Sequence, residues 1–229
     1  MNGFDISVIT SNLPYLFWEG MKVTISLTIL ATIGGIALGT LLALARLSGS
    51  KILGRVAGWY VNLFRSLPLL LVIFWFYFLV PYVAGWVTGS PRPVAVGGYL
   101  SALITFTLFE AAYFSEIIRA GIQSLPKGQA GAAAALGMTY PQSLRYVILP
   151  QAFRNMLPVM LTQTIILFQD TSLVYVVSLT DFLGAASKIA QIENRMVEMY
   201  VFAALVYLVI CFAASMLVKR LQARTTIIR

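Results

Sequence analysis

Long runs of hydrophobic residues, separated by short charged segments, dominate the pattern along this chain. The hydrocarbon core of a bilayer is ~30 Å thick, so an α-helix needs about 20 apolar residues to cross it. Runs of this length predict five transmembrane helices, at about residues 21–44, 59–83, 99–118, 156–179 and 199–218. We therefore expect an all-α, polytopic membrane protein in which residues 1–229 form a single transmembrane domain.

The stretch between the third and fourth expected spans has a different character. Residues 125–158 hold four prolines, two arginines and a lysine among their apolar residues, which is unfavourable inside a membrane. Within this stretch, residues 130–135 are alanines interrupted only by Gly131, and they predict a short helix of small residues. Because small side chains let another protein approach the backbone closely, we interpret the stretch as a docking surface outside the membrane.

The composition excludes several classes of protein. With 59% hydrophobic and 10% charged residues, the chain departs far from soluble domains, in which roughly a quarter of the residues are charged. It has a single cysteine, Cys211, and no histidine, which excludes an intrachain disulfide, a cysteine-built metal site and histidine-based acid–base catalysis. We expect no metal site and no catalytic residue.

The distribution of basic residues predicts the orientation. The net charge of +8 would suit a nucleic-acid-binding protein, but in membrane proteins basic residues concentrate on the cytoplasmic side. Assigning the segments between spans to alternate sides places four of the 16 basic residues on one side and twelve on the other. The richer side is expected to be cytoplasmic, with the N-terminus outside, and nucleic acid is not an expected partner. The twelve residues are Arg46, Lys51, Arg55, Arg65, Arg119, Lys127, Arg145, Arg154, Lys219, Arg220, Arg224 and Arg229.

Several residues are expected to shape the helices. Gly35 and Gly39 in the first span let a neighbouring helix approach closely. Pro68 is expected to kink the second span near its start. Residues 1–19 read as an interfacial lead-in with a turn at Pro14, and residues 180–198 as a short surface helix.

Ionisable residues in the spans are the candidate polar sites. Glu116 and Arg119 are spaced i,i+3 and can pair on one helix face, either as mutual neutralisation or as a docking or gating contact. Asp170 lies near the middle of the fourth span, where a carboxylate is costly and normally faces protein or a water-filled cavity. A role in a polar path and a structural pairing both fit Asp170.

The segment at 125–158 resembles a known signature. In bacterial ABC importer permeases of the amino-acid branch, the coupling loop reads roughly G-Q-x-E-A-A-x-A-L-G, followed by I-x-L-P-Q-A. Residues 148–152 match the second part. Gly131 stands where the family has glutamate, and it weakens a helix by about 1 kcal/mol relative to a good helix former. The residues that match the first part are Gly128, Gln129, Ala132, Ala133, Ala135, Leu136 and Gly137.

Other segments extend the resemblance over nearly the whole chain. FRSLPLLL at 64–71 is similar to F-R-G-T-P-L-L-x-Q, although Val72 replaces the glutamine. AAYFSEIIRAGIQSLPKGQ at 111–129 is similar to A-A-Y-x-x-E-x-x-R-G-G-I-x-S-I-x-x-G-Q. Residues 149–190 look most like the permeases of the glutamate/aspartate import system.

The resemblance implies a permease subunit of an ATP-driven importer of amino acids, here glutamate and aspartate. It implies a short cytoplasmic coupling helix, within about residues 125–150 between spans three and four, that seats in a groove of a cytoplasmic ABC ATPase dimer. It also implies a second permease subunit, in a heterodimer or homodimer, and a periplasmic substrate-binding protein. The chain would lie in the bacterial inner membrane, surrounded by lipid, with a periplasmic N-terminus and a cytoplasmic C-terminus.

ATP and magnesium would be bound by the ATPase, because this chain lacks the G-x-x-x-x-G-K-[ST] motif and is expected to be neither an enzyme nor a cofactor-binding chain. In the translocation path, the Asp170 carboxylate would pair with the α-ammonium group of the substrate, and neighbouring amides and hydroxyls would satisfy its other polar groups. These neighbours are Gln163, Gln169, Thr171 and Ser172.

Other classes of membrane protein fit less well. An ion-gradient-driven secondary transporter is the main alternative, although it would usually show more spans or an internal repeat. A channel would need a filter-like loop, and residues 84–98 lack a convincing one. A membrane enzyme would need a nucleophile, and the acidic cluster of Glu110, Glu116 and Arg119 has none.

Overall fold

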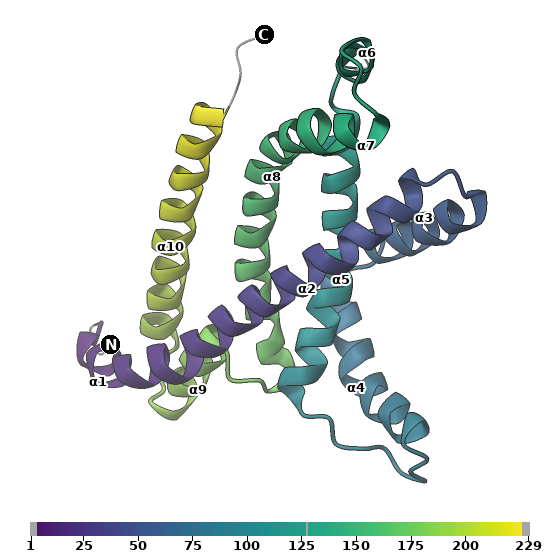
Figure 1. Cartoon of the computed structure of the whole chain (residues 1–229). Coiled ribbons are helices and arrows are strands. Elements are labelled where there is room, and N and C mark those ends of the chain that lie inside the picture. Colours follow the sequence, from purple (N-terminus) through teal and green to yellow (C-terminus); the bar gives the residue numbers. More distant parts are fainter. Residues whose placement is uncertain (1–3, 127, 226–229) are drawn as a thin grey trace.

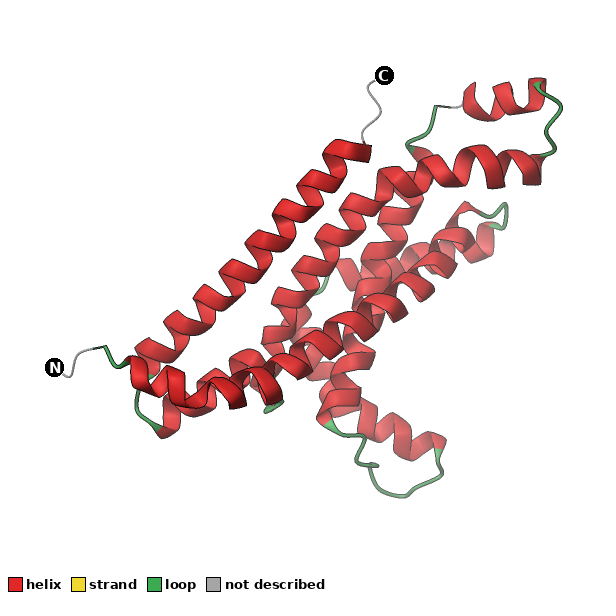
Figure 2. Ribbon diagram, turned by 60° about the vertical axis from the view of Figure 1, so that its left-hand side comes forward, coloured by secondary structure: helices red, strands yellow, loops and turns green. Residues whose placement is uncertain are grey.

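The computed structural model describes residues 4–126 and 128–225, and every regular element in these two ranges is a helix (Figure 2). Within these ranges, five helical segments are long and apolar enough to cross a membrane, as predicted. Lys127 and Arg229, two of the twelve expected cytoplasmic cations, lie outside the described residues. The five segments are Ile6–Leu47, Leu69–Val87, Gly98–Gln123, Pro141–Val177 and Met196–Ala223.

The first span is longer than predicted and begins within the expected lead-in. Helix α1 (Ile6–Tyr15) continues through a π-helical turn, η1 (Leu16–Met21), into α2 (Lys22–Leu47). Pro14 lies inside α1, so the turn expected at this proline is not formed. The helix begins instead at Asp5, whose carboxylate accepts a hydrogen bond from the backbone N–H of Ser7.

The second expected span is divided at Pro68. Helix α3 (Lys51–Arg65) ends before this proline, and α4 (Leu69–Val87) begins after it. The prediction of one kinked helix over 59–83 is therefore wrong, because Pro68 has an extended backbone (ψ 129°) and ends one helix instead of bending it. Of the two helices α3 and α4, only α4 has the length and hydropathy of a membrane span.

Helix α5 (Gly98–Gln123) lies at the centre of the bundle, and α2 crosses it diagonally (Figure 1). The two helices approach closely at glycine. A Cβ atom added to Gly39 would lie 2.9 Å from the carbonyl oxygen of Ala111, and one added to Gly35 would lie 2.9 Å from Cβ of Glu110. The packing role predicted for these glycines is confirmed.

The fourth span and the segment after it change helix type. Between α8 and α10, Asp181 begins α9 by accepting hydrogen bonds from the backbone N–H groups of Leu183 and Gly184, both at 3.0 Å. Helix α9 is the expected short helix, but one of its faces is buried against η1 and α10. Burial raises the pKa of Asp181 to about 7. The elements are α8 (Leu149–Asp170), the 3₁₀-helix η3 (Thr171–Val177), α9 (Phe182–Ile192) and α10 (Met196–Thr225).

Three short helices connect α5 to α8. Helix α6 (Gly128–Ala135) projects beyond the bundle at the end where α10 also ends, whereas α1 and α9 lie at the opposite end (Figure 1). Helix α7 (Tyr140–Ser143) and the π-helical turn η2 (Leu144–Ile148) then lead back into α8. The predicted short helix between the third and fourth spans is therefore present.

Candidate functional site

Helix α6 presents most of its surface to the surroundings. Ala133 is the buried residue of this helix, and the other alanines are exposed. Leu136, which follows directly, is 80% exposed. A helix of small side chains that ends in an exposed leucine offers a close-approach surface with an apolar contact at its edge.

The end of α6 is fixed by Gly137. Its backbone has φ +78°, and its N–H donates to the carbonyl of Ala134, while the N–H of Met138 donates to the carbonyl of Ala133. These two bonds form the cap that favours glycine in a left-handed conformation. Gly131 differs, because a Cβ atom there would meet nothing within 4 Å. Gly137 therefore has a structural role in α6 that Gly131 does not have.

A side-chain hydrogen bond joins α6 to the beginning of α8. The Nε2 atom of Gln151 donates to Oε1 of Gln129 over 3.2 Å and to the carbonyl of Val147 over 3.0 Å. Both glutamines belong to the segments that carried the resemblance. The first of these hydrogen bonds therefore links α6 to the first turn of α8 directly, in addition to the chain connection through α7 and η2.

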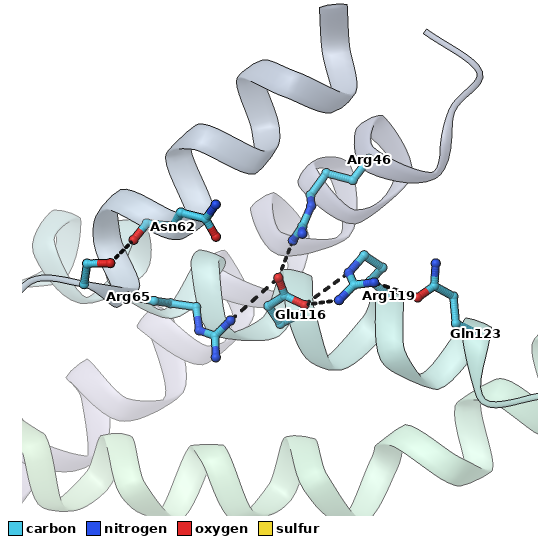
Figure 3. Close-up of polar contacts among 7 residues, drawn as sticks. Arg46, Asn62, Arg65, Glu116, Arg119 and Gln123 are labelled. Carbon is cyan, nitrogen blue, oxygen red and sulfur yellow. Dashed lines mark hydrogen bonds and ion pairs between the residues drawn. The ribbon is translucent and has the colours of Figure 1, made fainter. Parts of the chain in front are cut away.

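Glu116 of α5 lies among three arginines (Figure 3). Its Oε1 atom is 2.6 Å from Nη1 of Arg46, at the end of α2, and 3.6 Å from Nη1 of Arg65, at the end of α3. Its Oε2 atom is 2.7 Å from Nη2 of Arg119. The pairing predicted from the i,i+3 spacing is confirmed, and the cluster also ties α2 and α3 to α5.

A second polar group lies deeper in the bundle. Nε2 of Gln163, on α8, donates to Oε1 of Glu110, on α5, over 3.1 Å. The Glu110 side chain is buried, and its Oε2 atom has no hydrogen-bond partner among the described residues. Asp170 lies two helical turns beyond Gln163 on the same face of α8, and its carboxyl group interacts electrostatically with Glu110. Gln163, Asp170 and Glu110 thus form one polar group.

The other three predicted path residues lie apart from this group. The side chain of Gln169 lies beside Cys211 of α10. Thr171 is fully buried, and its hydroxyl donates to the carbonyl of Phe168 over 2.8 Å. Ser172 is half-buried within η3.

Sequence reasoning considered Glu110 only with Glu116 and Arg119, and missed its contact with Gln163 of α8. The signal was available, because Glu110 lies near the middle of a span and a carboxylate at that depth is costly, as for Asp170. Among the described residues, no group of three His, Cys, Asp or Glu side chains has an arrangement that could hold a metal ion.

Residues 35–227 match the family described as the inner membrane component of binding-protein-dependent transport systems. The chain belongs to this family. The glutamate/aspartate import permease protein GltK of Escherichia coli O157:H7 is 51% identical over 98% of this chain and 100% of its own length. The L-cystine transport system permease protein TcyB of Bacillus subtilis is 39% identical over 91% of this chain and 87% of its own length.

Solved structures share the fold. The crystal structure of an amino acid ABC transporter with histidines superposes with a TM-score of 0.85 and 31% identity, covering 98% of this chain and 100% of that one. An inward-facing structure of the MetNI methionine ABC transporter superposes with a TM-score of 0.74 over 93% of this chain and 97% of that one. Its identity is 18%, so this second likeness concerns the fold alone.

Membership of this family defines the general role of the chain. It is a multi-pass inner-membrane permease component of an ABC transport system and is not itself an enzyme. ATP is bound by a separate ATPase, and a substrate-binding protein belongs to the same system.

Proposed function

We propose that this chain is a permease subunit of an ATP-driven importer of the acidic amino acids L-glutamate and L-aspartate. The observation that carries this proposal is the 51% identity to a glutamate/aspartate import permease over that protein's entire length. The resemblance covers α5, α6 and α8, which hold the docking surface and the polar group, so it extends to the parts of the chain that would perform transport.

The end of the molecule that carries α6 faces the cytoplasm in this proposal, and the N-terminus lies in the periplasm. The excess of basic residues at the α6 end supports this orientation. Helix α6 then seats in a groove of the ATPase, where its exposed alanines permit close contact. Closure of the ATPase dimer moves α6, and the Gln129–Gln151 hydrogen bond passes the movement to α8.

The substrate path runs along the face of α8 that carries Gln163 and Asp170. The Asp170 carboxylate receives the α-ammonium group of the amino acid, as a charge-assisted hydrogen bond. Glu110 of α5, which accepts a hydrogen bond from Gln163, contributes a second acceptor further along the path. Gln169, Thr171 and Ser172 remain proposed path residues that would need a change of side-chain orientation or a second subunit to join this group.

A second, homologous permease subunit completes the path in a heterodimer. The composition of the polar group supports a second subunit. Its described residues, Glu110, Gln163 and Asp170, offer acceptors for an ammonium group, but none of them is a cation that could bind an acidic side chain. A cation supplied by the other subunit would provide the missing partner for the substrate's side-chain carboxylate.

The test is to purify the chain with its co-expressed partners and identify them by mass. The complex is then reconstituted with binding protein loaded with glutamate, aspartate, glutamine or arginine, and ATP hydrolysis is measured. Stimulation by glutamate and aspartate, with a second permease chain present, is the expected result. Stimulation by arginine alone would contradict the proposed substrates, glutamate and aspartate. Uptake driven by an ion gradient without ATP would contradict the ATP-driven mechanism.

A further inference from the structure

A cavity of about 680 Å³ lies between the last turns of α5 and the first turns of α8, at the end of the molecule that carries α6. It is separate from the polar group at Glu110, which does not line it. Its polar lining comes from α3, from α5 and its capping residue Ser124, from α8 and from α10, and consists of Arg65, Glu116, Ser124, Gln151, Arg154, Asn155 and Gln222.

The cavity has more positive than negative charge. Glu116 is the one acidic residue in its lining, and both of its carboxylate oxygens are already held by closer arginines, Arg46 at 2.6 Å and Arg119 at 2.7 Å. Arg65 is 3.6 Å from the same carboxylate and 44% exposed. Arg154 is exposed and forms no ion pair with any residue in 4–126 or 128–225. Arg154 is therefore available to a bound anion, and Arg65, the most distant of the three arginines around Glu116, can be shared between this carboxylate and the anion.

The same lining offers acceptors for a cation. Nδ2 of Asn155 donates to the hydroxyl of Ser124 over 2.9 Å, and the amide nitrogen of Gln151 donates to Gln129 and Val147. These bonds use the amide nitrogens and leave the two amide oxygens without a hydrogen bond from the described residues. Arginines beside free amide oxygens complement a zwitterion with carboxylate and ammonium groups.

We propose that this cavity is a low-affinity site for the transported amino acid on the α6 side of the membrane. Arg65 and Arg154 bind the carboxylates, and the amide oxygens of Gln151 and Asn155 accept hydrogen bonds from the ammonium group. An acidic amino acid uses both arginines because it has two carboxylates. The identity of the ligand rests on the substrate stated under Proposed function.

The site is placed to regulate transport. Gln151 lines the cavity and also donates to Gln129 of α6, so a ligand bound to Gln151 acts on the hydrogen bond that joins the docking helix to α8. Product that accumulates in the cytoplasm then occupies the cavity and slows the coupled cycle. This is inhibition by product from the side to which it is released.

The experiment uses the complete complex in liposomes, oriented with the ATPase outside and with glutamate-loaded binding protein in the lumen. ATP hydrolysis and release of labelled glutamate are measured while unlabelled glutamate, or glutamine at matched ionic strength, is added outside. We expect glutamate to inhibit in the millimolar range, and glutamine to require about tenfold more, since it has one carboxylate fewer.

Three variants test the assignment. Arg154→Gln should raise the half-inhibiting concentration of glutamate about tenfold, and Arg154→Lys, which keeps the charge, should raise it less. Arg55→Gln removes an exposed cation of α3 outside the cavity and should leave inhibition unchanged. Equal inhibition of the wild type and Arg154→Gln, or no inhibition of the wild type, would overturn the site.

Failure of this inference is distinct from failure of the proposed function. If lumenal glutamate-loaded binding protein does not stimulate hydrolysis by the wild type, the proposed substrate is wrong. If stimulation occurs but external glutamate has no effect, only the cavity site is wrong. If a lipid phosphate binds the same arginines instead, ATP hydrolysis by the wild type should depend on the anionic lipid content, and Arg154→Gln should remove this dependence. External glutamate would then have no effect, and the amino-acid site would be rejected.

Discussion

Oε1 of Glu116 lies 2.6 Å from Nη1 of Arg46, a contact that joins the middle helix α5 to the end of α2 across 70 positions of the sequence. Both side chains are largely buried, with 16% and 19% of Arg46 and Glu116 exposed. Glu116→Gln should lower the free energy of unfolding by roughly 1–3 kcal/mol, because the arginines around it lose their counter-charge. Thermal unfolding in detergent measures this change.

A double-mutant cycle with Arg46→Gln separates this contact from the others that Glu116 makes. A coupling energy of about 0.5–3 kcal/mol is expected for residues in direct contact. Arg55→Gln, at an exposed position on α3, is the control and should stay within about 0.5 kcal/mol of the wild type. A coupling energy of zero would show that the contact does not hold α2 to α5.

The crossing of α2 and α5 depends on the absence of a side chain at Gly39. Gly39→Ala should destabilise the protein by roughly 1–3 kcal/mol, because the new Cβ atom would lie 2.9 Å from both the Ala111 carbonyl oxygen and Cβ of Phe114. Gly58→Ala is the matched control. It also lies inside a helix, but its Cβ atom would meet nothing within 4 Å, so it should be neutral or gain up to about 1 kcal/mol from helix propensity. Equal unfolding temperatures for the two variants would contradict the close crossing.

The pKa of Asp181 predicts how stability depends on pH. Burial raises this pKa from 3.8 to about 7, so the folded state binds a proton more tightly than the unfolded chain does. The folded protein therefore loses stability as pH rises from about 4 to about 7, and the loss is complete above that range. Asp181→Asn keeps a side-chain acceptor for Leu183 and Gly184 and should unfold with a weaker pH dependence between pH 5 and 8. The same slope in the wild type and the variant would contradict the raised pKa.

Asp170 is the most direct test of the proposed substrate path. Asp170→Asn keeps the shape of the side chain and removes its charge, so the substrate's ammonium group loses a charge-assisted partner. We expect about a tenfold or greater fall in the rate of uptake per concentration of loaded binding protein, measured in liposomes with the complex assembled. Unchanged uptake together with unchanged substrate-stimulated ATP hydrolysis would remove Asp170 from the path.

Local patterns along the chain predict the number of spans, the close packing at Gly35 and Gly39, and the Glu116–Arg119 pair, because each depends on residue type, on neighbours within a few residues or on hydrophobic length. Contacts between residues that are distant in the sequence could not be predicted in this way. Arg46 is 70 positions from Glu116, and Gln163 is 53 positions from Glu110, so no periodic pattern reveals that either pair meets. Each pair meets only because α2 and α8 pack against α5 in the folded protein.

The division of the second expected span at Pro68 shows a second limit of prediction from the sequence. A proline in an apolar run either kinks a helix or ends it, and the choice depends on whether the preceding residues have another place to pack. Here Tyr60 of α3 donates from its hydroxyl to the carbonyl of Leu108 over 2.7 Å, and Phe64 is buried in the same cluster. These contacts with α5 hold α3 as a separate helix.

In the proposed function α6 couples this permease to the ATPase, and two neighbouring substitutions in α6 test this role. Ala132→Glu and Gly131→Glu place the same side chain at adjacent exposed positions of α6. Gly131→Glu should preserve assembly and coupling, because its side chain enters open space and the coupling-loop signature that the segment resembles has glutamate at this position.

The measurement is the number of glutamate molecules transported per ATP hydrolysed by the reconstituted complex with loaded binding protein. We expect this ratio to stay at the wild-type value in Gly131→Glu and to fall about tenfold or more in Ala132→Glu, because a bulky charge prevents close contact with the ATPase. A wild-type ratio in Ala132→Glu would show that α6 does not couple the permease to the ATPase.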